Sequence, residues 1–167
     1  HIFMALALYL NDKNDVAHVS VADVLEQGAQ FDKANEEYAK ILKDSPVYFM
    51  AQLKTVSNEM AQDHYAAARK KIETLIKEYP DNEQLMFNMG EVLRMSGDHK
   101  DAIKYYNKAL DLTAEKDVDA WTVYYALGIS YERNNEWEKA ETAFKKALTS
   151  SNGHPYVLNY LGTLLEI

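Results

Sequence analysis

The sequence predicts an all-α fold, a solenoid (α-α superhelix) of antiparallel helix hairpins that forms a single domain over residues 1–167. GDHKDAIKYYNKAL (residues 97–110) is followed 38 residues later by NEWEKAETAFKKAL (residues 135–148), with Ala, an aromatic residue and Ala-Leu at matching offsets. Counting back from Ala102 in steps of 34 reaches Ala68 and Ala34, so one period covers most of the chain. Apolar residues recur at helical spacing, and six Gly and three Pro are too few for a sandwich or barrel.

The period divides the chain into elements. Residues 1–14 are expected to be the last turns of the second helix of a preceding hairpin. Their apolar run IFMALALYL (residues 2–10) is too short to span a bilayer. The alternative for this run, the end of a signal peptide, lacks the basic segment that should precede it. Repeats follow at 15–48, 49–82, 83–120 and 121–154, with four extra residues near 113–119, and residues 155–167 begin a further repeat.

Each repeat is expected to be a helix-turn-helix hairpin. Gly90 and Gly128 should let the two helices of a hairpin approach closely, with Ala102 and Ala140 filling the crossing and the next aromatic packing between hairpins. Gly162 repeats this position near the end of the chain. In the turn between helices, Gly97 should end one helix and Asp98 should cap the next. Ser45-Pro46 and His154-Pro155 indicate further helix starts.

The sequence resembles the tetratricopeptide repeat (TPR) family, whose units carry Leu, Gly/Ala and Tyr on helix A and Ala, Phe/Tyr and Ala on helix B. The fourth repeat matches this pattern at Tyr124, Leu127, Gly128, Tyr131, Ala140, Phe144 and Ala147. The third repeat matches at Met86, Met89, Gly90, Leu93, Ala102, Tyr106 and Ala109. The second repeat departs, with Gln52 and Glu59 at apolar positions, so its helix A is expected to be rotated or one residue out of phase and to use Leu53, Val56 and Met60.

The resemblance implies a protein-interaction scaffold that binds a partner peptide or helix in an apolar concave groove lined by the A helices. Carrying the family's groove positions over gives Met50, Leu53, Phe87, Glu91, Arg94, Tyr125, Ile129, Arg133, Tyr156 and Asn159. These apolar and aromatic residues are expected to be exposed and to suit adaptable peptide recognition. The basic clamp of chaperone-binding relatives is absent, because matching positions hold Val19, Asp23, Ser57, Gln84 and Phe87.

No residue pattern indicates an enzyme, a cofactor or a metal site. The chain has no Cys, its five His are not at metal-ligand spacing, and no phosphate loop or catalytic motif occurs. A net charge of −8 disfavours nucleic acid, and a 34-residue period disfavours the related 35-residue RNA-reading repeats. His64 and His99 are expected to be solvated turn residues, and His18 to be packed in a helix.

The alternative function is structural: a segment of a longer bacterial array that associates with itself through its apolar terminal helices. The apolar end YVLNYLGTLLEI (residues 156–167) favours this interpretation, since natural arrays usually end in a polar capping helix. No membrane insertion is expected, and a soluble location in bacterial cytoplasm or periplasm fits equally well.

Overall fold

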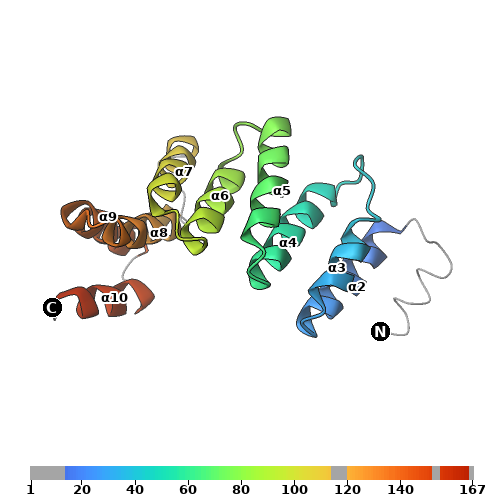
Figure 1. Cartoon of the computed structure of the whole chain (residues 1–167), viewed down its shortest axis with the longest axis horizontal. Helices are drawn as coiled ribbons and strands as arrows, with labels where there is room; N and C mark the ends of the chain where they lie inside the picture. Colours follow the sequence, from blue (N-terminus) through green and yellow to red (C-terminus); the bar gives the residue numbers. More distant parts are fainter. Residues whose placement is uncertain (1–13, 114–119, 152–154, 166–167) are drawn as a thin grey trace. The chain divides into compact units, whose positions relative to one another are not determined.

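The computed structural model describes residues 14–113, 120–151 and 155–165, and every regular element in these ranges is an α-helix. The prediction of an all-α fold of sequential antiparallel helix pairs is confirmed. The helices, drawn in Figure 1, are α2 (Asp15–Gln27), α3 (Phe31–Tyr38), α4 (Tyr48–Ala61), α5 (Tyr65–Glu78), α6 (Glu83–Met95), α7 (His99–Leu112), α8 (Ala120–Arg133), α9 (Trp137–Ser150) and α10 (Pro155–Leu165). The expected end of a helix in residues 1–13 and the insertion at 114–119 lie outside the described residues.

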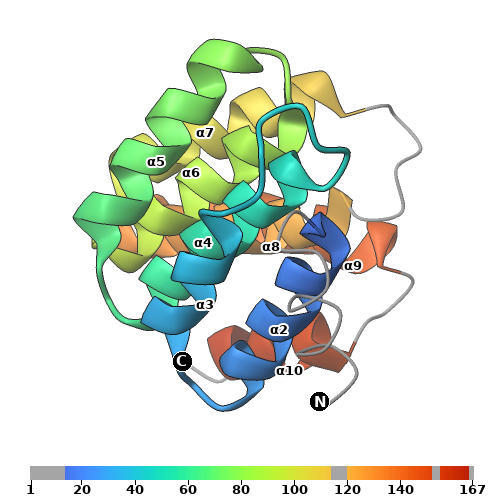
Figure 2. The same cartoon turned by 90° about the vertical axis from the view of Figure 1, so that its right-hand side faces the viewer.

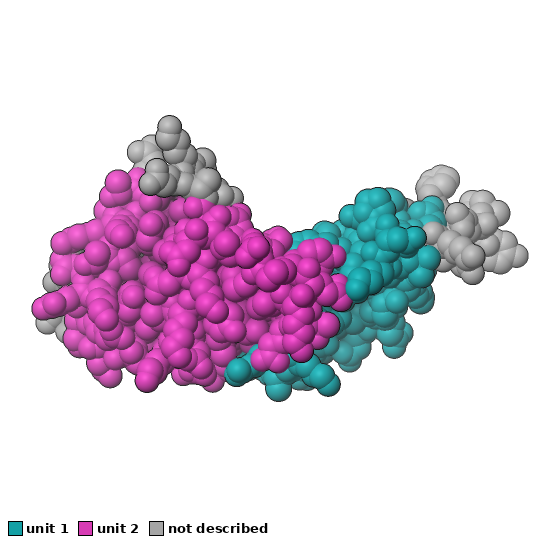
Figure 3. Space-filling view, turned by 90° about the horizontal axis from the view of Figure 1, so that it is seen from above, with its two compact units in different colours: residues 1–71 teal, residues 72–167 magenta. Residues whose placement is uncertain are grey.

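The chain forms two compact units, residues 1–71 and residues 72–167, which Figure 3 colours separately. In the first unit α2 packs on α3 and α3 packs on α4, as Figure 2 shows from the side. Its core holds Ala22, Ala34, Tyr38, Ile41 and Ala51. In the second unit α6 pairs with α7 and α8 pairs with α9, while α7 packs on α8 and α10 contacts α9.

The turn within each hairpin has the same backbone conformation in all four repeats. A residue with positive φ occurs at Ala29 (53°), Asp63 (59°), Gly97 (89°) and Asn135 (61°), at spacings that reproduce the period of the sequence. Positive φ favours glycine, and Asn and Asp tolerate it better than Ala does. Gly97 therefore ends its helix as expected, and Asp98 caps α7 by accepting a hydrogen bond from the Asp101 amide at 3.3 Å.

The spacing between Gly and the aromatic residue, which recurs in the third and fourth repeats, places an aromatic ring directly on the backbone of the partner helix. A Cβ added to Gly90 would lie 2.5 Å from the ring of Tyr106, and one added to Gly128 would lie 2.6 Å from the ring of Phe144. The aromatic residue of helix B thus packs on the glycine of its own hairpin, and Phe144 also lies 4.8 Å from the Tyr160 ring of the next hairpin, between hairpins as expected. Gly162 differs, because no described atom lies within 4 Å of a Cβ placed there.

Two local expectations were wrong. Helix α4 buries Ala51, Thr55, Val56 and Asn58, while Leu53 and Met60 are only half-buried. The polar side chains can be buried because Thr55 donates to the Ala51 carbonyl at 3.0 Å and Asn58 donates to Asn35 at 2.9 Å. Pro46 lies within a turn, and α4 starts only at Tyr48, whereas α10 does begin at Pro155.

Candidate functional site

A hollow of about 260 Å³ lies between α6 and α8 in the second unit. We call it the α6–α8 hollow. Phe87, Glu91 and Arg94 line it from α6, and Trp121, Thr122, Tyr125, Ala126 and Ile129 line it from α8. These residues face one space because they recur at three- and four-residue intervals, which place side chains on one face of a helix. The surface is mainly apolar, with one charged pair at its edge.

Two aromatic residues of the hollow, Phe87 and Tyr125, each pack against a ring of the next helix, α7 or α9. The Phe87 ring lies 5.9 Å from the Tyr106 ring, and the Tyr125 ring lies 5.9 Å from the Phe144 ring in an edge-on arrangement. Phe87 and Tyr125 are half-buried, which corrects the expectation that they are exposed. Each ring is therefore partly exposed in the hollow and partly packed against the core.

The charged edge of the hollow is already hydrogen-bonded. The Arg94 guanidinium donates to both oxygens of Glu91, at 3.1 and 2.7 Å, and the Tyr106 hydroxyl donates to Glu91 at 2.5 Å. Burial and the Glu91 charge raise the pKa of Tyr106, and the Glu91 hydrogen bonds raise the pKa of Arg94. Glu91 and Arg94 are consequently held in place and neutralise each other.

The first unit contains a tyrosine–carboxylate contact at the same register, with a basic partner that comes from the next repeat. The Tyr38 hydroxyl contacts Asp23 and Glu26, each at 3.1 Å, and Lys54 donates to Glu26 at 2.8 Å and to Asp23 at 3.3 Å. Burial and the two carboxylates raise the pKa of Tyr38. Asp23 and Glu91 both follow the small residue that receives the helix B ring, so a buried tyrosine hydroxyl fixes a carboxylate on helix A in both repeats.

The structure brings together half of the groove residues expected from the sequence. Phe87, Glu91, Arg94, Tyr125 and Ile129 line the α6–α8 hollow. Arg133 is exposed one helical turn beyond Ile129 and does not line it. Asn159 is exposed on α10, and the side chain of Tyr156 lies outside the described residues. Met50 and Leu53 are half-buried on α4 in the other unit.

Sequence reasoning missed Tyr160, which extends the aromatic row. Its ring lies 5.6 Å from Tyr125 and 4.8 Å from Phe144, and its hydroxyl donates to Glu132. Burial and this hydrogen bond raise the pKa of Tyr160. The position corresponds to Ala126 in the preceding repeat, where the ring has no counterpart, so the repeat pattern held no signal for it.

The three histidines within the described residues differ from one another. His18 is buried as expected, with Nδ1 2.7 Å from Glu37, and His64 is exposed. His99 is half-buried, and its Nδ1 has no hydrogen-bond partner, so it is not the solvated residue that was expected. Burial and the nearby charges of Arg133 and Arg94 lower the pKa of His99.

Over residues 14–113, 120–151 and 155–165, no group of His, Asp and Glu is placed to hold a metal ion. Nor does any helix of those ranges combine the length and apolar character needed to cross a membrane.

The sequence is similar to known proteins built from helical repeats. A family model described as tetratricopeptide repeat matches residues 57–115 and 84–153, which together span more than half of the chain. The general transcriptional corepressor trfA of Dictyostelium discoideum is 25% identical over 144 residues, which is 86% of this chain and 10% of that protein. A photosystem I assembly protein, Ycf3 of Prochlorococcus marinus, is 29% identical over 105 residues, 60% of each chain.

The fold also matches solved structures. MamA from Desulfovibrio magneticus superposes with a TM-score of 0.74 at 16% identity, covering 92% of this chain and 84% of that one. At this identity the likeness concerns the fold alone. The chain spans about a tenth of the corepressor's length, so the activity of that whole protein does not transfer with the match.

Proposed function

The chain belongs to the tetratricopeptide repeat family, and we propose that it is a scaffold whose α6–α8 hollow holds an apolar side chain of a partner peptide or helix. The family consists of interaction scaffolds and not of enzymes. The observation that carries the proposal is that five groove residues expected from the sequence line one hollow. They come from two different repeats, which a groove along the A helices requires.

The size and chemistry of the hollow favour a side-chain anchor. About 260 Å³ is below the roughly 300–1,000 Å³ of most small-molecule sites, so the hollow accommodates part of a chain better than a whole ligand. Phe87 and Tyr125 are held by rings beneath them, so little side-chain entropy is lost when a ligand packs on them. Glu91 and Arg94 neutralise each other, which favours an apolar rather than a charged anchor.

The test uses Ile129→Glu. Ile129 is only half-buried, and Arg133 one turn later can pair with an introduced carboxylate in place of the tyrosine hydroxyl that Glu91 receives at the same register of α6. The variant should therefore fold while placing a charge in the apolar hollow. Leu42→Glu is the matched control, because Leu42 is 60% exposed after α3 and lies outside the hollow.

The probe is a random peptide library displayed on phage and selected on the immobilised protein. Selected peptides should share an apolar or aromatic residue, bind Leu42→Glu like the unmodified protein, and lose at least about tenfold in affinity on Ile129→Glu. Melting curves of both variants serve as the folding check. Selected peptides that bind Ile129→Glu and the unmodified protein equally well would refute the use of this hollow.

Self-association is the second candidate, favoured by apolar side chains exposed near both ends of the described chain. Val16 of α2 is 65% exposed and Leu158 of α10 is 50% exposed. We expect the molar mass measured by light scattering to rise with concentration, and the Leu158→Glu variant to abolish the rise. A monomeric mass across the whole concentration range would remove this candidate.

A further inference from the structure

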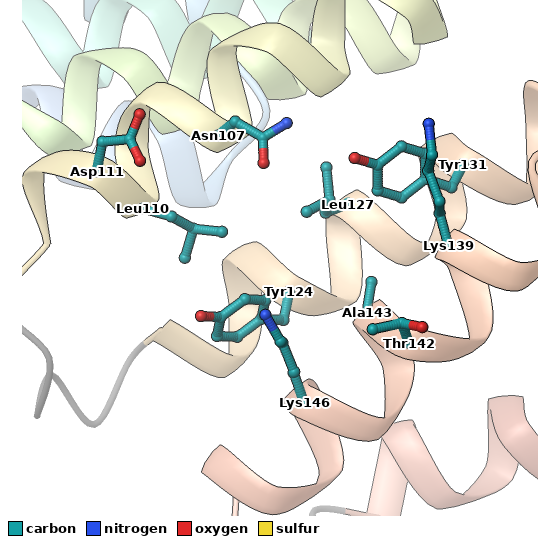
Figure 4. A pocket seen from close by; sticks show the side chains of 10 residues that line it. All are labelled: Asn107, Leu110, Asp111, Tyr124, Leu127, Tyr131, Lys139, Thr142, Ala143 and Lys146. Carbon is teal, nitrogen blue, oxygen red and sulfur yellow. The ribbon is translucent and has the colours of Figure 1, made fainter.

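A second and larger depression lies between α7 and α9 and is floored by α8 (Figure 4). It has a volume of about 440 Å³, and we call it the α7–α9 cleft. Tyr124, Leu127 and Tyr131 line it from α8, and Lys139 and Lys146 line it from α9. Asp111 lies on the α7 wall. None of these residues lines the α6–α8 hollow, so the two surfaces can be tested separately.

Two matching lysine–tyrosine pairs form one side of the cleft. The Lys146 ammonium lies 5.4 Å from the centre of the Tyr124 ring, and the Lys139 ammonium lies 5.6 Å from the centre of the Tyr131 ring. Figure 4 shows each lysine beside its tyrosine. The symmetry follows from the antiparallel hairpin, in which seven residues separate the two tyrosines along α8 and the two lysines along α9.

The polar ends of these side chains are available to a ligand. Over the described residues, the hydroxyls of Tyr124 and Tyr131 make no hydrogen bond, whereas Tyr38, Tyr106 and Tyr160 each donate to a carboxylate. Lys146 forms no ion pair with any described residue. Lys139 pairs with Glu136 at 2.5 Å, but its side chain is 64% exposed, and such a pair is weak.

The two tyrosines bring hydroxyls to the cleft that the preceding repeat does not have. In that repeat the same register holds Met86 and Leu93, which are buried at 5% and 1% exposure. In the fourth repeat the residues are half-buried tyrosines that line the open cleft. Their rings fit the repeat pattern and pack as Met86 and Leu93 do, while their hydroxyls add two hydrogen-bond donors beside two positive charges.

The spacing of the pairs defines the ligand. Seven residues along an α-helix correspond to about 10 Å, so the two donor groups lie about that far apart. In an extended polyproline-II segment, side chains three residues apart point the same way and are separated by about 9 Å. Leu127 and Ala143, both buried in the cleft floor, lie between the pairs and can contact an apolar residue of the segment.

We propose that the α7–α9 cleft binds an extended acidic peptide segment whose two carboxylates, three residues apart, are bound by Lys146 with Tyr124 and by Lys139 with Tyr131. Each carboxylate receives an ammonium and a phenol donor, and such charge-assisted hydrogen bonds are stronger than neutral ones. Asp111 on the opposite wall and the net charge of −8 disfavour a continuous polyanion such as nucleic acid. A segment with two separated charges fits both features.

The probe is a fluorescein-labelled synthetic peptide with two aspartates three residues apart and leucines between them, titrated by anisotropy at low and high salt. Its comparator carries asparagine at both aspartate positions. We expect the aspartate peptide to bind at least about tenfold more tightly than the comparator, with the difference shrinking as salt screens the charges. Equal binding of the two peptides, or no binding of either, would overturn the proposal.

Two doubly substituted proteins locate the site. Lys139→Glu with Lys146→Glu should weaken binding of the aspartate peptide at least about tenfold. Lys104→Glu with Lys108→Glu is the matched control, because Lys104 also has an ion pair within its helix, with Asp101, and Lys108 also lies over a ring, that of Tyr105. Both proteins change net charge equally, so equal losses would show a general charge effect and refute the cleft.

A third protein tests the hydroxyls. Tyr124→Phe with Tyr131→Phe keeps both rings and should weaken binding about threefold to tenfold, since each lost hydrogen bond to a charged group is significant. Unchanged affinity would refute the role of the hydroxyls. Displacement of the bound peptide by polyuridine RNA from the unmodified protein, absent with Lys139→Glu and Lys146→Glu, would replace the peptide proposal with a nucleic-acid site.

Discussion

Gly90 and Gly162 occupy the same register, and replacing each by alanine should have opposite effects. In a helix interior, Gly→Ala normally stabilises by about 1 kcal/mol, because alanine loses less backbone entropy on folding. Gly162 should follow this rule, since no described atom lies within 4 Å of the added Cβ. At Gly90 the added Cβ would lie 2.5 Å from the Tyr106 ring, a distance that neighbouring carbons do not adopt.

The cost at Gly90 follows from how Tyr106 is held. Tyr106 is completely buried, and its hydroxyl donates to Glu91, so the ring cannot move aside without breaking a charge-assisted hydrogen bond. Overpacking a core costs about 1–3 kcal/mol, and a hydrogen bond to a charged group contributes about 1.5–3 kcal/mol. The ring either stays and is overpacked or moves and loses the bond, so the cost is one of these two, at most about 3 kcal/mol, and subtracting the gain of about 1 kcal/mol in helix propensity leaves a net loss of roughly 2 kcal/mol.

Urea denaturation followed by circular dichroism measures the free energy of unfolding of each variant. In thermal melts, Gly90→Ala should lower the melting temperature by about 4–8 °C, while Gly162→Ala should leave it unchanged or slightly higher. Gly128→Ala is a second case, with the Cβ 2.6 Å from Phe144, and should behave like Gly90→Ala. A stabilised Gly90→Ala protein would refute the view that the glycine exists to receive the ring.

Three further predictions follow from the same contacts. Ala29→Gly should stabilise the protein by about 0.5–1 kcal/mol in urea denaturation, because Ala29 has φ 53° where the register-equivalent turn uses Gly97; a loss of stability would contradict this. Tyr106→Phe should destabilise by about 1.5–3 kcal/mol by removing the buried hydroxyl that donates to Glu91 beside Arg94, whereas Tyr105→Phe, on a half-buried ring, should change stability by less than about 0.5 kcal/mol; equal effects would refute the Glu91 bond. Burial alone would raise the pKa of Glu37, but hydrogen bonds from Lys40 and His18 lower this pKa below 4.5. The ionised Glu37 therefore stabilises the protein above pH 4.5, and this stabilisation is lost as the pH falls below that value. Glu37→Gln should make the free energy of unfolding depend less on pH in the acid range, and an unchanged acid slope would contradict this.

The features that could be predicted from the sequence are those set by spacing along the chain. Helix pairs, the turn at Gly97, the cap at Asp98 and the start of α10 all follow from local rules, and the structure has them. The same spacing placed Phe87, Tyr125 and Ile129 on one helix face each, which is why they meet in one hollow.

The features that could not be predicted depend on contacts between helices. Phe87 and Tyr125 are half-buried because rings on α7 and α9 lie beneath them, and no pattern within α6 or α8 contains that information. Helix α4 buries Thr55 and Asn58 because acceptors exist at the Ala51 carbonyl and at Asn35. Tyr160 joins the aromatic row from a register position that is alanine in the repeat before it.

The buried residue of helix B determines which polar group helix A can carry on its groove side. Tyr38 and Tyr106 bring a hydroxyl to this position, and the residue after the small one is the acid Asp23 or Glu91, whose charge is then satisfied. In the fourth repeat the helix B residue is Phe144, which has no hydroxyl, and the helix A position that holds the acid elsewhere is Ile129. In the second repeat the helix B residue is Ile72, which also has no hydroxyl, and the helix A position is the exposed Ser57. A carboxylate on a half-buried face needs a donor, because an unpaired one would be costly. The surface chemistry of each repeat is therefore coupled to its own core: repeats with tyrosine present a fixed acid with a basic partner, and the repeat with phenylalanine presents an apolar residue.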